Sequence, residues 1–345
     1  MNNHTTCKAS ASSLDMEIQP KIKEKLYSGS GRITVSLHGE KAVLSELSST
    51  YPLKLLSPHI QDGTAIVYLL TYGGGLVGGD EIDLVVDVQL GAGLLLLSQV
   101  SLSTSVDFYS CIHIQGSTKV FKSRLGRRLA CTDTNEAPSL MSGPSDGLSS
   151  TKQTSHFLVA SESVLLLLPE PVTCFCDASY NQIQKFEISE GGSAVILDWI
   201  TSGRMSRGEE WAFSRYYSVN DIWYNGKRVA KDVTLLDNQH DKCIPKRPLQ
   251  DKLQPYSCYA MLFLYGLRVH HIIAELGSQY DKISILKSKV PSQLIWSISP
   301  IDSTGQGVVV RVGGDDTETV KAWLKQALSG IQDIIGKDAY RRIFS

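Results

Sequence analysis

The stretch Thr71–Asp80, TYGGGLVGGD, has the glycine spacing of a dinucleotide-binding turn. Gly73, Gly75 and Gly78 match G-x-G-x-x-G, a motif in which the N–H groups at the start of a helix bind a pyrophosphate. The residues that follow, Ile82–Leu90, are apolar at every second position, which predicts a half-buried strand instead of a helix. We therefore expect no nucleotide here. The glycines more plausibly allow positive φ angles or the close approach of another backbone.

Acidic and basic side chains crowd into one later stretch, DWITSGRMSRGEEWAF. Within thirteen residues it contains Asp198, Arg204, Arg207, Glu209 and Glu210. Paired carboxylates can act as general acid and base, so a β-rich hydrolase that uses Asp198, Glu209 and Glu210 is one interpretation. The two arginines would lower the carboxylate pKa values, which suits an ion-pair network that holds a bend between two strands.

Two smaller features could also do chemistry. Asp80 ends the glycine turn, either as a plain turn residue or as a functional carboxylate. In an extended chain the thiols of Cys174 and Cys176 would lie on one face and could bind a soft metal, with ordinary buried cysteines as the alternative. His270 and His271 are adjacent, so on a helix they would point about 100° apart and could not share a metal ion.

Several classes of protein are excluded by motif and charge. The sequence has no P-loop, no H-E-x-x-H and no G-x-S-x-G motif. Its 34 basic residues are balanced by 35 acidic ones, which gives no electrostatic case for binding nucleic acid or an anionic membrane. Seven cysteines without regular spacing do not resemble a disulfide framework, and no secretion signal is evident at the start. We expect a cytoplasmic protein.

The elements that must position these residues are mostly strands. From Gly31 onward, short β-branched or alternating runs are separated by turn residues, which predicts a mainly β architecture. We find no internal sequence repeat. We expect a flexible tail over residues 1–30 and a single domain over 31–345, with a flexible loop at 132–154 that is rich in Ser, Thr, Gly and Pro.

Two helices are predicted within this β-rich chain. The apolar run 258–276 is too short to span a bilayer and is interpreted as a buried helix, with Ser257 as its N-cap and Gly277 as its C-cap. A second helix is predicted over 317–335, because Asp315 and Glu318 resemble a capping box and apolar residues follow at helical spacing.

Five segments, in this order, resemble one family: LLTYGGGLVGGD, GSTKVFK, LLLLPEPVTCF, ASYNQIQKFEI and LDWITSGRMSRGEEWAF. Together they are similar to the urease accessory proteins called UreD, or UreH in some bacteria. The resemblance runs from about Gly31 to the C-terminus and is sharpest over 68–124 and 164–217.

The resemblance implies an elongated, mainly β scaffold with a few helices that is not an enzyme. UreD-like proteins bind apo-urease together with a helical UreF-type protein and a UreG-type GTPase. That assembly delivers nickel to the urease metallocentre, and nickel is thought to pass through the interior of the UreD-like protein. The resemblance thus implies nickel in transit, no stably bound cofactor, and no nucleic-acid or membrane partner.

The family motifs assign candidate site residues, which are Gly74, Gly75, Gly79, Asp80, Lys119, Asp198, Arg204, Arg207, Gly208 and Glu209. Transient nickel contacts are expected at Asp80, Glu209, Cys174 and Cys176, because a conduit needs oxygen, nitrogen or sulfur groups that bind Ni²⁺ loosely. A buried carboxylate is costly unless it is paired, so such groups should come with partners.

One segment departs from the family pattern. In the family, the strand after the glycine turn leads directly to the G-S-T-K-V-F motif, whereas here Val100–Gln115 intervene after Gln99. An intron that encodes these sixteen residues would keep the reading frame when retained, and the residues at its two ends are compatible with splice sites. Our hypothesis is a retained intron or gene-model error, with a lineage-specific loop as the alternative. Reads of spliced mRNA that join Gln99 to Gly116 would support the intron.

Overall fold

The computed structural model describes residues 27–61, 63–98, 101–102, 114–115, 118–122, 150–238, 247–283 and 292–344. Residues 1–26 of the predicted tail, most of the insert and residues 132–149 of the predicted loop lie outside the described residues. At the end of that loop the prediction is wrong, because Thr151–Thr154 already belong to a strand. Within the insert, Ser101–Leu102 pairs with Ile114–Gln115 as β7 and β8, and the intron hypothesis stays a prediction.

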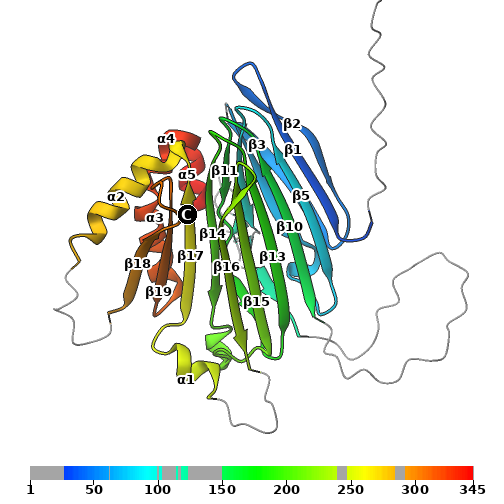
Figure 1. Ribbon diagram of the computed structural model, residues 1–345. Helices are drawn as coiled ribbons and strands as arrows, with labels where there is room; N and C mark the ends of the chain where they lie inside the picture. Colours follow the sequence, from blue (N-terminus) through cyan, green and yellow to red (C-terminus); the bar gives the residue numbers. More distant parts are fainter. Residues whose placement is uncertain are drawn as a thin grey trace, which may run out of the picture.

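Two large sheets form the molecule, which confirms the mainly β class (Figure 1). The seven-stranded sheet has the order β16 (Lys227–Asp237), β15 (Arg215–Tyr224), β13 (Ser179–Ile188), β10 (Thr151–Val159), β5 (Glu81–Val88), β1 (Ser30–His38), β2 (Lys41–Ser49). The ten-stranded sheet has the order β18 (Leu294–Pro300), β19 (Gly307–Gly314), β17 (Cys258–Tyr265), β14 (Ser193–Thr201), β11 (Val164–Leu167), β6 (Gly93–Ser98), β4 (Thr64–Thr71), β3 (Leu53–Gln61). Beside β14, β12 (Val172–Cys174) pairs with β9 (Thr118–Val120).

The centre of the molecule is built from three stacked units, although the sequence shows no repeat. The chain crosses from the seven-stranded to the ten-stranded sheet five times, and the three central crossings are β5–β6, β10–β11 and β13–β14. In the first sheet Val88, Val159 and Ile188 are in register, and the strands of the second sheet begin in register as well. The three units repeat the same backbone geometry. Each unit needs a similar pattern of buried positions, but the residues at those positions can differ.

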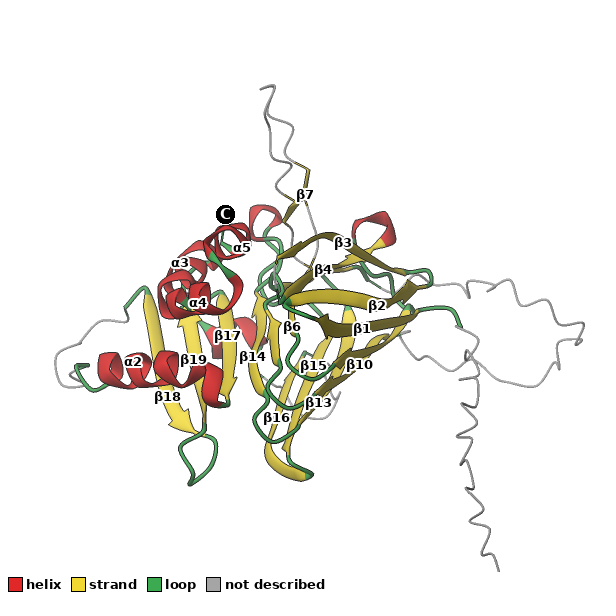
Figure 2. Cartoon of the chain, turned by 90° about the horizontal axis from the view of Figure 1, so that it is seen from above, coloured by secondary structure: helices red, strands yellow, loops and turns green. Residues whose placement is uncertain are grey.

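The two faces of each strand explain this layering. β5 alternates buried and half-buried residues because one face packs on the other sheet. β6 and β14 are buried at every position, because helices cover their second face. Four helices, α2 (His270–Tyr280), α3 (Thr317–Ala327), α4 (Gln332–Ile335) and α5 (Lys337–Ile343), gather on the side of β17–β19 (Figure 2). The short helix α1 (Leu249–Leu253) lies apart from them, at the bottom of the view in Figure 1.

The predicted helix at 258–276 is wrong over its first half. Cys258–Tyr265 is β17, a central strand between β14 and β19, and the helix begins only at His270. A strand buried on both faces is apolar throughout, so its period cannot be told from that of a buried helix. Ser257 is accordingly no N-cap, and Gly277 lies inside α2. Among the helices of the described residues, none has the length and apolar character needed to cross a membrane.

The predicted C-terminal helix is confirmed with two changes. The range 317–335 holds α3, a short 3-10 turn at Ser329–Ile331, and α4. The N-cap is Asp316, one residue later than predicted, and its side chain accepts a 2.6 Å hydrogen bond from the Thr319 N–H.

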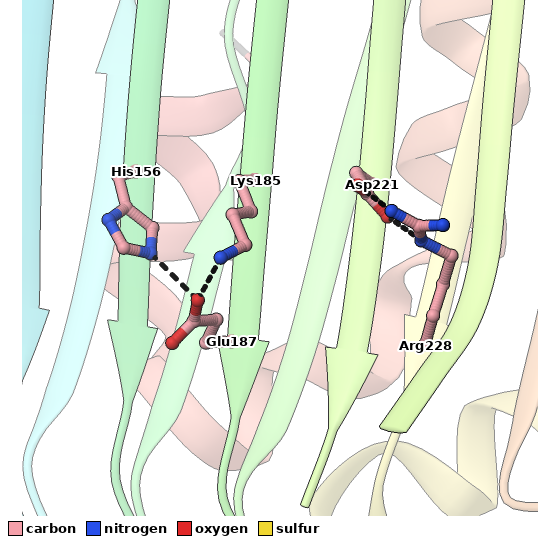
Figure 3. A network of polar contacts seen from close by, with 5 residues as sticks. All are labelled: His156, Lys185, Glu187, Asp221 and Arg228. Carbon is pink, nitrogen blue, oxygen red and sulfur yellow. Dashed lines mark hydrogen bonds and ion pairs between the residues drawn. The ribbon is translucent and has the colours of Figure 1, made fainter. Parts of the chain in front are cut away.

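The outer face of the seven-stranded sheet carries ion pairs that are at least partly exposed (Figure 3). Glu187 on β13 accepts from Lys185 and lies 3.3 Å from His156 on β10. Arg228 on β16 makes two hydrogen bonds, of 2.8 and 3.0 Å, to Asp221 on β15. Exposed pairs of this kind contribute little to stability.

Candidate functional site

The glycine turn brings two distant motifs together. Leu76 donates its N–H to the Lys119 carbonyl at 2.8 Å and accepts from the Phe121 N–H, also at 2.8 Å. A Cβ on Gly75 would lie 2.5 Å from the Phe121 ring and 2.6 Å from the Lys119 oxygen. Gly74 and Gly79 instead have positive φ angles of 79° and 90°. Both predicted uses of these glycines, close approach and left-handed backbone, are confirmed.

Asp80 closes the turn that these glycines form. Its carboxylate accepts a 2.8 Å hydrogen bond from the Val77 N–H, and its own N–H donates to the Val77 carbonyl. Its carbonyl oxygen accepts from the Lys152 N–H at the start of β10. These contacts agree with the turn-residue interpretation; the predicted contact of Asp80 with nickel stays a prediction.

The chain after β14 forms a second turn, which an ion pair spans. Arg204 donates through Nε to Glu209 at 2.8 Å and makes a second contact to the same carboxylate. Glu209 also accepts from the Cys176 N–H at 3.2 Å, and Arg204 stacks 4.1 Å above the Phe175 ring. Gly208, in the left-handed conformation, ends the short 3-10 turn Met205–Arg207 inside this loop.

This arrangement is the predicted ion-pair network at a bend. The hydrogen bonds from Arg204, together with that from the Cys176 backbone and the nearby charge of Arg207, hold the pKa of Glu209 below its usual value. Glu210 points elsewhere, since it accepts a 2.9 Å hydrogen bond from Gln250.

The two thiols of Cys174 and Cys176 have different surroundings, so the shared face expected of an extended chain is not formed. β12 ends at Cys174, whose side chain is buried, and the chain turns at Cys176, which is partly exposed. Burial raises the pKa of the Cys174 thiol, and burial together with the Asp177 and Glu209 charges raises that of Cys176. Neither thiol is thus favoured as a thiolate, the form that binds metals.

Asp198 lies in the interior, within a network that the sequence did not predict. It is on β14, with 8% of its surface exposed, and faces the seven-stranded sheet. Four neutral groups donate to it, namely Gln182 Nε2 at 3.2 Å, the Tyr216 hydroxyl at 3.3 Å, Ser218 Oγ at 2.7 Å and Asn220 Nδ2 at 2.7 Å. Burial, with smaller effects of charge, raises the pKa values of Tyr180 and Tyr216, so both keep their protons.

The network also holds acceptors with no partner among the described residues. These are Asn220 Oδ1 and Gln184 Oε1, both buried. The signal that could have identified them is the alternation of β13 and β15, in which Gln182, Gln184 and Ser218 occupy inward positions normally taken by apolar residues.

Asp198 separates two cavities between the sheets. A cavity of about 410 Å³ lies toward β17, β18 and β19 and is lined by Tyr259, Met261 and Arg311 among others. A smaller one of about 60 Å³ lies toward β4, β6 and β11 and reaches Ser98 and Glu170. Asp198 and Trp199 line both. Asp198 is therefore a polar group shared by the linings of two separate spaces.

The fold brings the motif residues to two places instead of one. The turns of residues 72–80, 174–177 and 202–211 meet the strand β9 at the end of β12. There Val120 of β9 pairs with Cys174, and Thr173 pairs with Thr201 of β14. Asp198 belongs to the interior network, and neither cavity that it lines includes Glu209 or Glu210. The three carboxylates of the hydrolase interpretation thus do not share a pocket. Within the described residues, no group of three His, Cys, Asp or Glu side chains is arranged to hold a metal ion.

Known proteins resemble the chain along nearly its whole length. The family described as UreD urease accessory protein matches residues 28–103 and 107–344. Urease accessory protein 4 of Cryptococcus neoformans is 32% identical over 92% of this chain and 95% of its own length. Urease accessory protein D of Arabidopsis thaliana is 29% identical over 90% of this chain and 99% of its own. Urease accessory protein UreD of Sorangium cellulosum is 30% identical over 91% and 84%. The family match covers most of the chain, and the relatives align along nearly its whole length. The chain therefore belongs to the UreD family of urease accessory proteins.

Proposed function

We propose that this protein is a non-enzymatic scaffold that delivers nickel to apo-urease, and that nickel passes Asp198 on its way through the interior. The observation that carries the proposal is the position of Asp198 between two cavities, with neutral groups around it. Membership of the UreD family supplies the context of urease maturation.

The chemistry of the Asp198 network suits a cation that binds briefly. A buried carboxylate costs several kcal/mol, and neutral donors offset that cost only in part. A divalent cation beside it would restore charge balance, and Gln184 Oε1 and Asn220 Oδ1 offer unpaired oxygens nearby. Oxygen ligands bind Ni²⁺ less firmly than thiolates or imidazoles do, which favours release.

The same proposal names partners and a compartment. The partners are apo-urease, a UreF-type protein and a UreG-type GTPase, and the compartment is the cytoplasm. The three described cysteines, Cys174, Cys176 and Cys258, are free thiols, in keeping with a reducing compartment. The near-zero net charge of -1 supports neither nucleic acid nor a membrane as a partner.

A deletion strain tests the proposal. Without this protein we expect urease to be synthesised but to remain inactive and poor in nickel, and re-expression of the wild-type chain should restore both. Normal urease activity in the deletion strain would refute the function. A hydrolase acting independently of urease would leave the nickel content of urease unchanged.

A further inference from the structure

The larger cavity is open at one edge of the ten-stranded sheet. On the side facing the other sheet, Ile295 of β18, Gly313 of β19 and Tyr259 of β17 lie in one row across the strands. Gly313 has no side chain, and tyrosine rings lie over it, since a Cβ at this position would be 3.3 Å from the Tyr259 ring and 3.5 Å from the Tyr256 ring. The row forms part of the lining of the 410 Å³ cavity, whose surroundings are mostly apolar. Ile295 itself is 48% exposed.

The neighbouring row contains an exposed cation one strand from its end. Asp198, Met261, Arg311 and Ser297 follow one another across β14, β17, β19 and β18. The Arg311 side chain is 51% exposed, and its ion pair with Asp232 of β16 is long, at 4.0 Å. Ser297, between Arg311 and the sheet edge, is short and leaves room for the guanidinium group to reach outward.

The hydrogen-bonding edge of β18 is unlike the other outer edges of the two large sheets. Among the described strands, β18 pairs only with β19. Its sequence, LIWSISP, has no charged residue. The strands at the other outer edges of the two large sheets carry charges, at Lys41 and Glu46 in β2, Lys54 in β3, and Lys227, Arg228 and Lys231 in β16. Charged edge residues prevent unwanted strand pairing, so their absence marks β18 as an edge that can accept another strand.

We propose that β18 is a docking edge for an extended segment of a partner protein in urease maturation. The partner strand would pair with the β18 backbone, place an apolar side chain beside Ile295, and place an acidic side chain two positions along, beside Ser297 and within reach of Arg311. Strands added to a sheet edge gain affinity from main-chain hydrogen bonds and specificity from alternate side chains. This inference rests on the function proposed above.

A second copy of this chain is a poorer occupant than a partner. Pairing β18 with another β18 would supply apolar side chains, but Leu294–Pro300 contains no carboxylate to neutralise Arg311. Charge complementarity therefore favours a segment of different sequence.

Hydrogen–deuterium exchange of the full-length protein tests the inference, first alone and then with purified apo-urease and the UreF-type protein. We expect the amides of 294–300 to become protected when the partners bind. Ser297→Lys adds a cation beside Arg311 and should weaken that binding by about tenfold or more. Ser45→Lys, the matched change on the edge strand β2, should leave binding unchanged.

Each outcome separates the possibilities. Binding of the partners without protection of 294–300, or with equal affinity for Ser297→Lys, would overturn the docking edge and leave the proposed function intact. Protection of 294–300 that depends on the concentration of this protein alone would show self-pairing in place of a partner. If neither apo-urease nor the UreF-type protein binds, the proposed function fails, and the docking edge fails with it.

Discussion

Asp198 and Glu209 are both carboxylates of the same sequence block, yet they are stabilised in opposite ways. Glu209 lies at the motif turns, where Arg204 supplies a guanidinium group and Cys176 a backbone N–H. Asp198 lies between the sheets, where all four donors are neutral. The first carboxylate already has a countercharge. The second has hydrogen bonds but no cation among them, which makes it the better contact for a metal ion in passage.

The comparison predicts its largest effect for removal of the interior carboxylate. Asp198→Ala leaves four buried donors without their acceptor and should lower the free energy of unfolding by roughly 3 kcal/mol, as measured by urea denaturation. The control is Asp221→Ala on the neighbouring β15, whose partner Arg228 is half exposed, and it should cost less than about 1 kcal/mol. Equal losses for the two variants would contradict the buried network.

The motif turns should be most sensitive where backbones touch. Gly75→Ala places a methyl group against Phe121 and the Lys119 carbonyl and should destabilise the protein by about 2 kcal/mol. Gly74→Ala meets no atom within 4 Å and has only its positive φ to pay for, which should cost about 1 kcal/mol. Urea denaturation measures both variants. A larger loss for Gly74→Ala would show that close approach is not what fixes this turn.

The ion pair between Arg204 and Glu209 at the motif turns should have the smallest effect, and one that depends on pH. The pKa of Glu209 is lowered in the folded state, so its contribution to stability is complete above its ordinary value of 4.5 and is lost as the pH falls through the lowered value. Glu209→Gln should therefore lower the thermal midpoint at pH 7, whereas the wild-type protein and the variant should converge in acid. A difference that persists unchanged at low pH would exclude this ion pair as its cause.

The sequence predicted those features that depend on local pattern. Alternation identified β5 and so removed the nucleotide interpretation of the glycine turn, and the charges around Arg204 predicted an ion pair across a bend. It failed for β17, because a strand buried on both faces has no distinguishing period. The sequence interpretation also assigned Asp198 and Glu209 to one site. Their proximity in the chain does not show that the strand directs Asp198 inward, whereas the following turn holds Glu209 elsewhere.

The interior network depended on strand pairing, which the sequence does not reveal. Gln182 of β13 and Ser218 of β15 meet Asp198 only because β14 crosses to the opposite sheet between them. The inward position of these polar residues is visible in the alternation of each strand, but their common partner is not.

The nickel content of urease matured with Asp198→Asn tests the central claim most directly. This variant keeps the size of the side chain and removes its charge, and Asp221→Asn on the exposed face is its matched control. With equal amounts of each protein in the maturation complex, we predict roughly tenfold less nickel in urease for Asp198→Asn and a wild-type content for the control. A wild-type nickel content with Asp198→Asn would contradict passage of nickel beside this carboxylate.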